Sequence, residues 1–240
     1  RGQELRDWFK TKPTLEATKS VMAQVIYNLY RIQQRYTGFR HHDLHVGNIL
    51  VRPAPKKDIQ IRLKNKKYSI SNGGVEAVMI DFGFAVFPRI KNPLVNQRNY
   101  INIGISRKSH KYYDLHYFLN NMHNMAREPS NMTERRVKTL VESLLPVEYL
   151  AMTSRKVKTG RLRGDMDHAL PGFETVLSRP FFTGETALEK VIPVPKVQKP
   201  VVVVQAPKPK TPVNQKAAMA RAIAVMKAGP QKKKAVIRRK

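Results

Sequence analysis

Two short polar motifs in a fixed order constrain this 240-residue chain more than any other feature of its sequence. The first, HHDLHVGN, carries His41, Asp43 and Asn48, and the second, DFG, begins at Asp81. Two carboxylates and an amide are poor ligands for an anion, but their oxygens are the ligands that Mg²⁺ prefers beside substrate phosphates. The two motifs together therefore predict a site that binds an anion through a metal ion.

The residues around both motifs predict where they lie in a fold. Apolar residues at helical spacing predict a long amphipathic helix over residues 15–36, and Gly38 supplies its stop. Short apolar segments predict strands over residues 48–51 and 75–80. The first motif is therefore expected in a loop after a helix and the second at the end of a strand, where a rigid scaffold can orient functional side chains.

The remaining periodicity predicts a mostly α (α+β) fold with a small β-hairpin region. Alternating residues predict a strand over 59–63, and apolar faces predict helices over 114–126 and 133–145, the second with Thr133 as its N-cap. Residues 155–165 are expected to form a basic loop, and residues 176–182 an apolar closing segment.

The composition changes after about residue 187, which predicts a domain over 1–187 and an extended basic tail over 188–240. Residues 191–240 contain 13 Lys/Arg, seven Pro and no Asp or Glu, a composition that cannot bury a core by itself. One alanine-rich stretch predicts a short helix near 215–228. Such a cationic segment attracts nucleic acid, anionic membranes or acidic proteins, and the alternative is a solvated basic surface without a dedicated partner.

The chain contains no cysteine, which excludes disulfides and thiolate metal sites. No apolar run approaches the roughly 20 residues that span a bilayer, and no signal-peptide pattern opens the sequence, so we expect an intracellular protein that is not secreted. A zinc site made by His41, His42 and His45 is a weaker alternative for the first motif, because no fourth ligand follows at helical spacing.

The order H-x-D-x4-N followed by D-F-G resembles the catalytic loop and the metal-binding motif of the protein kinase superfamily. The resemblance implies ATP and Mg²⁺ as cofactors. It implies that Asp43 orients or deprotonates the acceptor hydroxyl and that Asn48 and Asp81 hold the metal ion. His45 stands where serine/threonine kinases usually carry a phosphate-contacting Lys, so a neutral imidazole is expected to act more weakly there.

The same resemblance assigns supporting residues. It places Leu50 and Ile80 beneath the base of ATP, and it gives Gly83 the sharp backbone turn behind the metal ligand. His41 and Asp114 are expected to support the catalytic loop, Asp114 as a buried anchor from a later helix. The alternative for His41 is a core histidine, and the alternative for Asp114 is an ordinary helix N-cap.

The sequence also departs from the kinase pattern. No Gly-rich loop, strand Lys or helix Glu precedes Asp43, so the resemblance is to the C-terminal lobe alone, with a missing N-lobe as its partner. Such a lobe forms the floor of an ATP site without its roof, and we expect little kinase activity from it alone.

His42 replaces the usual Arg, which makes control by an activation-loop phosphate doubtful. Because small-molecule phosphotransferases share H-x-D-x4-N, a protein acceptor is an open question.

The chain most resembles the divergent serine/threonine kinases of nucleocytoplasmic large DNA viruses, of the chlorella-virus type. The resemblance lies in the segments HHDLHVGNILV, IDFGFAV and YDLHYFLN. The first hypothesis is a virion-associated kinase homologue, located in the virion or the host-cell interior. The second is a non-catalytic, minor capsid-type protein that binds neighbouring virion or capsid proteins, or DNA, through residues 191–240. A protein that condenses nucleic acid is a third and weaker possibility, since the tail has few aromatic residues to stack on bases.

Overall fold

The computed structural model describes residues 2–64, 66–95, 97–164 and 166–184. The predicted tail, residues 188–240, and its helix near 215–228 lie outside the described residues and stay predictions. The helices are α1 (Leu5–Lys10), α2 (Leu15–Arg35), the 3-10 turn η1 (Val46–Asn48), α3 (Arg98–Ile101), α4 (Tyr113–Met125), α5 (Met132–Leu144), α6 (Val147–Leu150), α7 (Phe173–Leu177) and α8 (Pro180–Thr183). The strands are β1 (Gln3–Glu4), β2 (Ile49–Pro53), β3 (Asp58–Leu63), β4 (Lys66–Ser71), β5 (Val75–Met79), β6 (Val157–Lys158) and β7 (Arg161–Leu162).

Helix α2 runs through the centre of the core, and the prediction of a long helix before the first motif is confirmed. Thr14 caps it, since its hydroxyl accepts a hydrogen bond from the Ala17 amide at 3.2 Å. Gly38, at φ +92°, follows the end of the helix in a conformation that favours glycine. The apolar side chains that the helix buries include Val21, Met22, Val25, Ile26 and Leu29.

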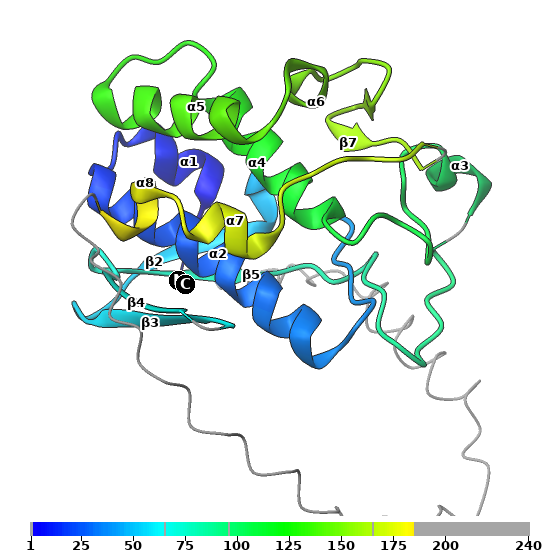
Figure 1. Cartoon of the computed structure of the whole chain (residues 1–240), viewed down its shortest axis with the longest axis horizontal. Helices are drawn as coiled ribbons and strands as arrows, with labels where there is room; N and C mark the ends of the chain where they lie inside the picture. Colours follow the sequence, from blue (N-terminus) through cyan, green and yellow to red (C-terminus); the bar gives the residue numbers. More distant parts are fainter. Residues whose placement is uncertain (1, 65, 96, 165, 185–240) are drawn as a thin grey trace, which may run out of the picture. The chain divides into compact units, whose positions relative to one another are not determined.

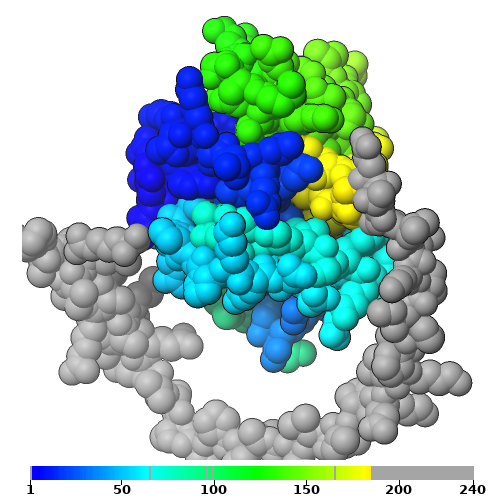
Figure 2. All heavy atoms as spheres, turned by 90° about the vertical axis from the view of Figure 1, so that its left-hand side faces the viewer, coloured from blue at the N-terminus to red at the C-terminus, as the bar shows by residue number. Residues whose placement is uncertain are grey.

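Strands lie on one side of α2, and helices α4 and α5 lie on the other (Figure 1). The strands form a three-stranded sheet in the order β1-β2-β5, with Ile49 opposite Met79 in the antiparallel β2–β5 pair, and a separate β3–β4 hairpin. Figure 2 shows the segment of β2 to β5, in cyan, as a layer against the blue helices. Gln24 of α2 ties the helix to the edge strand β5, donating to the Val75 carbonyl at 3.0 Å and accepting from the Ala77 amide at 2.9 Å.

The structure confirms the two later helices and corrects the start of the second. Asn131, and not Thr133, is the N-cap of α5, because its side-chain oxygen accepts from the Glu134 amide at 2.9 Å. Glu134 in turn accepts from Asn131 Nδ2 at 2.7 Å and from the Ser130 amide, so the two side chains together cap the helix start. Buried Val137, Leu140, Val141 and Leu144 then pack α5 onto the core.

The segment 155–165 was expected to be a loop, and part of it is a hairpin. Strands β6 and β7 pair antiparallel around Thr159 and Gly160, both with positive φ values, of 52° and 75°. Two residues of positive φ match the right-handed twist of the flanking strands in a tight hairpin. Val157 and Leu162 are buried, so the hairpin is packed against the domain rather than free in solvent.

The closing segment lies in the core, as predicted. Val176 and Leu177 of α7 and Phe182 of α8 are buried, and α2 contacts both short helices. Within the described ranges, no helix combines the length and the apolar character that a bilayer-crossing segment requires.

Candidate active site

The loop of residues 41–48 leaves the core between α2 and β2 and is anchored on a buried carboxylate. Asp114, the second residue of α4, is fully buried and accepts hydrogen bonds from the amides of His41 and His42, each at 2.8 Å. The N-cap of α4 is Tyr112, so Asp114 is not the cap of its own helix. Two charge-assisted bonds from one side chain fix the backbone immediately before Asp43.

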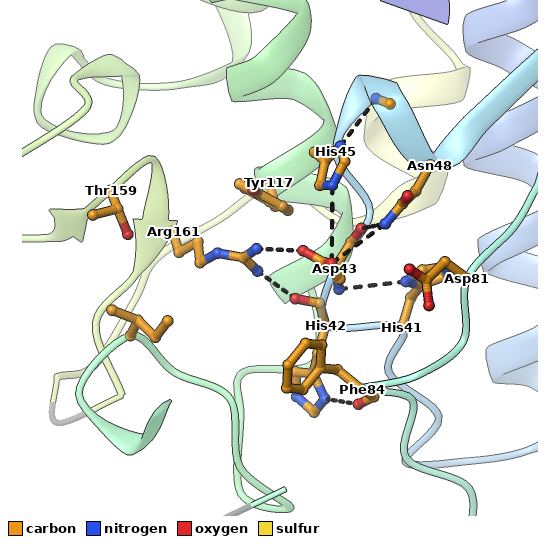
Figure 3. A network of polar contacts seen from close by, with 12 residues as sticks. His41, His42, Asp43, His45, Asn48, Asp81, Phe84, Tyr117, Thr159 and Arg161 are labelled. Carbon is orange, nitrogen blue, oxygen red and sulfur yellow. Dashed lines mark hydrogen bonds and ion pairs between the residues drawn. The ribbon is translucent and has the colours of Figure 1, made fainter. Parts of the chain in front are cut away.

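The carboxylate of Asp43 lies at the centre of a polar network (Figure 3). Its Oδ1 is paired with the guanidinium of Arg161, which also donates to the carbonyl of His42. Its Oδ2 accepts from Asn48 Nδ2 at 3.3 Å and faces His45 Nε2 at 3.9 Å. Asn48 Nδ2 also donates to the Asp43 carbonyl at 2.9 Å. The first motif thus brings Asp43, His45 and Asn48 together.

Two histidines precede Asp43 in the loop, and hydrogen-bond partners account for their ring nitrogens. His41 accepts from the Asp43 amide at 3.3 Å through Nδ1 and donates to the Ile80 carbonyl at 3.0 Å through Nε2. His42 donates to the Phe84 carbonyl at 3.0 Å, and its other nitrogen contacts Ser109 Oγ at 2.7 Å. Both rings are therefore held in place by hydrogen bonds, and burial lowers the pKa of His42 below its ordinary value.

The charge state of His45 follows from its burial. Burial lowers the pKa of His45 below its ordinary value, and the Asp43 carboxylate opposes this effect only in part. Its Nδ1 accepts from the Gly47 amide at 3.0 Å, which places the proton on the Nε2 atom that faces Asp43. The imidazole therefore faces Asp43 Oδ2 from 3.9 Å, at the position where the sequence analysis expected a weakly acting group.

The second motif follows β5 directly and lies beside the first. The Ile80 amide donates to the Asn48 carbonyl at 2.9 Å, which joins the two motifs through their backbones. Asp81 has φ +60°, a value that an L-residue adopts only with support, and its Oδ1 accepts from the Gly83 amide at 3.1 Å. Asp81 and Phe82 are exposed, and the Phe82 ring packs on His41 with centroids 4.7 Å apart.

Leu50 and Ile80, expected under the base of ATP, are both half-buried. Leu50 pairs with Val78 across the β2–β5 register, and on its other side it pairs with Glu4 of β1. Leu50 belongs to the sheet, and Ile80 follows β5 directly and is tied to Asn48 through its amide. Both side chains keep part of their surface accessible, and their place under a nucleotide base stays a prediction.

The oxygen atoms of Asn48 and Asp81 fit a hard cation. The NH₂ group of Asn48 donates to Asp43, and the Oδ1 atom of Asn48 accepts no hydrogen bond from the described residues. In Asp81 the Gly83 amide donates to Oδ1, and Oδ2 accepts no hydrogen bond from the described residues. One amide oxygen and one carboxylate suit Mg²⁺, which binds through one or two protein groups together with water and phosphate oxygens.

The zinc alternative is wrong for the described part of the chain. No group of three or more His, Cys, Asp or Glu side chains there could hold a metal ion. The physical reason is that the ring nitrogens of His41 and His42 are already hydrogen-bonded and that Nδ1 of His45 accepts from Gly47.

Sequence reasoning missed Arg161, the residue in closest contact with Asp43. It lies 118 positions away, in a segment interpreted only as a basic loop. The Thr-Gly pair between two short apolar alternations was the signal for a hairpin, but nothing in the sequence indicated which side chain the hairpin carries to Asp43.

Comparison with known proteins finds related serine/threonine protein kinases. A family model described as poxvirus serine/threonine protein kinase matches residues 8–184. A serine/threonine-protein kinase of Acanthamoeba polyphaga mimivirus is 28% identical over 194 residues, which is 75% of this chain and 41% of that protein. Bovine haspin, a serine/threonine-protein kinase, is 30% identical over 81 residues, which is 34% of this chain and 10% of haspin.

A serine/threonine-protein kinase of Dictyostelium discoideum is 40% identical over 96 residues, which is 36% of this chain and 8% of that protein. A crystal structure of a kinase domain aligns with a TM-score of 0.32 and 16% identity, over 75% of this chain and 71% of that one. The chain thus spans less than half the length of the kinases that it matches in sequence. The family model covers well over half of the chain, and the chain therefore belongs to the poxvirus serine/threonine protein kinase family.

Proposed function

We propose that the native protein carrying this chain transfers the γ-phosphoryl group of ATP to a hydroxyl group of a protein, with Asp43 facing the acceptor. The observation that supports this most is the arrangement of the Asp43 carboxylate. Its backbone is fixed by Asp114, and its Oδ1 is held by Arg161. From the described residues its Oδ2 accepts one long hydrogen bond, from Asn48, and faces His45 at 3.9 Å.

Asp43 Oδ2 is the atom proposed to receive the acceptor. A carboxylate oxygen has two lone pairs, so Oδ2 can accept a hydrogen bond from a hydroxyl while it keeps Asn48. The proton of that hydroxyl then has a base within reach as the phosphoryl group transfers. Phosphoryl transfer needs alignment and charge neutralisation more than covalent help, so an oriented carboxylate is the group that this half of the reaction requires.

Asn48 and Asp81 are proposed to hold Mg²⁺, and Leu50 and Ile80 to lie under the nucleotide base. When bound, Mg²⁺ neutralises charge on the transferring phosphates. Asn48 has two tasks in this scheme, because the NH₂ group that orients Asp43 also directs the amide oxygen toward the metal side. The bond between the Ile80 amide and the Asn48 carbonyl joins the two segments that carry these ligands.

The test is transfer of labelled phosphate from ATP to a protein or peptide mixture that presents Ser, Thr and Tyr. Loss of a general base usually lowers the rate by about 10²–10⁴-fold, and we expect this for Asp43→Asn. Asp58→Asn is the matched control, since Asp58 is an exposed carboxylate on the β3–β4 hairpin. Absence of transfer by the native protein, or equal activity of the two variants, would contradict the proposal.

A further inference from the structure

Arg161 is a buried cation delivered to the catalytic carboxylate by a distant hairpin. Its side chain is 12% exposed, and its guanidinium contacts Asp43 Oδ1 and the His42 carbonyl through two different nitrogens. The same group lies over the ring of Tyr117, 4.1 Å from its centroid. A planar guanidinium held on two oxygens and one aromatic face has a single orientation.

The hairpin that carries Arg161 is itself fixed to the core. Asn120 of α4 donates to the Gly160 carbonyl at 3.0 Å, and the Gly160 amide donates to the Met152 carbonyl at 2.7 Å. Leu162, the next residue along β7, is buried. The position of the guanidinium is therefore set by packed backbone rather than by a flexible loop.

The positive charge beside Asp43 comes from Arg161 and not from the loop itself. Burial opposes the charge on Arg161, but its interactions with Tyr113, Tyr117 and Asp43 outweigh burial and raise its pKa above the ordinary value. Among the described residues, ion pairs to Asp43 involve only Arg161 and His45. His45 Nε2 lies 3.9 Å from Asp43 Oδ2, whereas the guanidinium bonds Oδ1 directly, so the guanidinium is the cation held against the carboxylate.

We propose that Arg161 is a positioning residue for phosphoryl transfer and that it acts through Asp43. The guanidinium occupies Oδ1 and the preceding carbonyl, so the carboxylate cannot rotate and Oδ2 is the oxygen presented to the acceptor hydroxyl. This inference rests on the proposed function and adds to it a residue outside both motifs. It also couples the β6–β7 hairpin to the rate of the chemical step.

The experiment compares Arg161→Ala, Arg161→Lys and Lys158→Ala in the native protein, with kcat and KM for ATP measured separately. We expect Arg161→Ala to lower kcat about 100-fold and to leave KM for ATP nearly unchanged, because only the alignment of Asp43 is lost. Arg161→Lys keeps the charge but cannot hold both oxygens in fork geometry, so it restores part of kcat. Millimolar guanidinium added to Arg161→Ala should also restore part of kcat.

Lys158→Ala is the matched control, since Lys158 pairs with Arg161 in the hairpin register and has no contact with Asp43 among the described residues. It removes the same charge from the same hairpin and should retain the wild-type kcat. If Arg161→Ala matches Lys158→Ala in kcat, the inference is overturned while the proposed function stands. If neither the lysine nor guanidinium restores activity and the melting temperature falls in parallel, Arg161 is only structural. If the wild-type protein transfers no phosphate, the proposed function fails first and this inference fails with it.

Discussion

The loop of residues 41–48 and the turn at residues 81–83 each contain a residue with positive φ, but the two are held very differently. His42, at φ +64°, is fully buried and bonded through its amide, its carbonyl and both ring nitrogens. Asp81, at φ +60°, is exposed and is held by one bond to the Gly83 amide. A similar backbone conformation is therefore supported by several buried hydrogen bonds at His42 and by one exposed hydrogen bond at Asp81.

This difference separates the two halves of the proposed reaction. The acceptor side, built around Asp43, depends on buried groups that the fold itself provides. The metal side, at Asp81, is accessible and has oxygen atoms that no described residue uses. A preorganised carboxylate lowers the cost of alignment during transfer, whereas a group that must receive an incoming nucleotide and metal needs to be reachable. The free energy of unfolding should therefore depend strongly on the buried groups that hold residues 41–48 and only weakly on the side chains of residues 81–83.

The largest effect is expected from Asp114→Ala. The change leaves the amides of His41 and His42 buried without acceptors. Each hydrogen bond to a charged group contributes roughly 1.5–3 kcal/mol, so loss of two should lower the free energy of unfolding by about 3–6 kcal/mol. Urea unfolding measures this, with Asp58→Ala as an exposed carboxylate control. A loss below about 1 kcal/mol would mean that the loop does not depend on its buried anchor.

Acid should weaken the same buried scaffold through His116 of α4. Burial lowers the pKa of His116 from 6.5 to about 4, and its Nε2 donates to the Tyr149 carbonyl at 2.9 Å. The unfolded chain binds the proton more readily, so the stabilising effect is complete above pH 6.5 and is lost as the pH falls toward 4. Between pH 7 and pH 5 this group should cost about 2 kcal/mol.

The matched variant for the acid effect is His116→Gln, which keeps an amide donor for Tyr149 and does not titrate. Its unfolding free energy should change less between pH 7 and pH 5 than that of the wild type, by roughly the same 2 kcal/mol. Equal pH dependence of both proteins would show that folding does not lower the pKa of His116 and would contradict this prediction.

The smallest effects on stability are expected in the turn. Phe82→Ala removes the ring contact with His41 and should cost about 1 kcal/mol, because the ring is 43% exposed. Asp81→Asn should change stability by no more than about 0.5 kcal/mol, since Asn tolerates positive φ. Thermal unfolding of both variants tests this. If either variant loses nearly as much unfolding free energy as Asp114→Ala, the proposed difference in stability between the two regions is wrong.

Much of the fold and of the motif geometry was predictable because it is local in sequence. The 3.6-residue pattern before Gly38 predicted α2, and the apolar runs after Asn48 and Gly74 predicted β2 and β5. The order of the motifs also predicted that Asp43 follows a helix and that Asp81 follows a strand. In each case the determining interactions lie within a few residues of one another.

The misses depend on contacts between distant segments or on competing local signals. Thr133 was chosen as the cap of α5 although Asn131, three residues before Glu134, forms the capping pair that the structure uses. Arg161 could not be placed beside Asp43, since the hairpin register and its docking through Asn120 decide where that side chain lies. Periodicity carries no information on such long-range pairing.

The division between an acceptor side and a metal side is tested most directly by a Mg²⁺ titration of phosphoryl transfer in the native protein. The account predicts that Asp81→Asn raises the Mg²⁺ concentration for half-maximal activity about tenfold or more. It predicts that Asp43→Asn lowers kcat by about 10²–10⁴-fold and leaves that concentration unchanged. If the two variants respond to Mg²⁺ alike, or if Asp43→Asn alone shifts the metal requirement, the roles assigned to the two carboxylates are wrong.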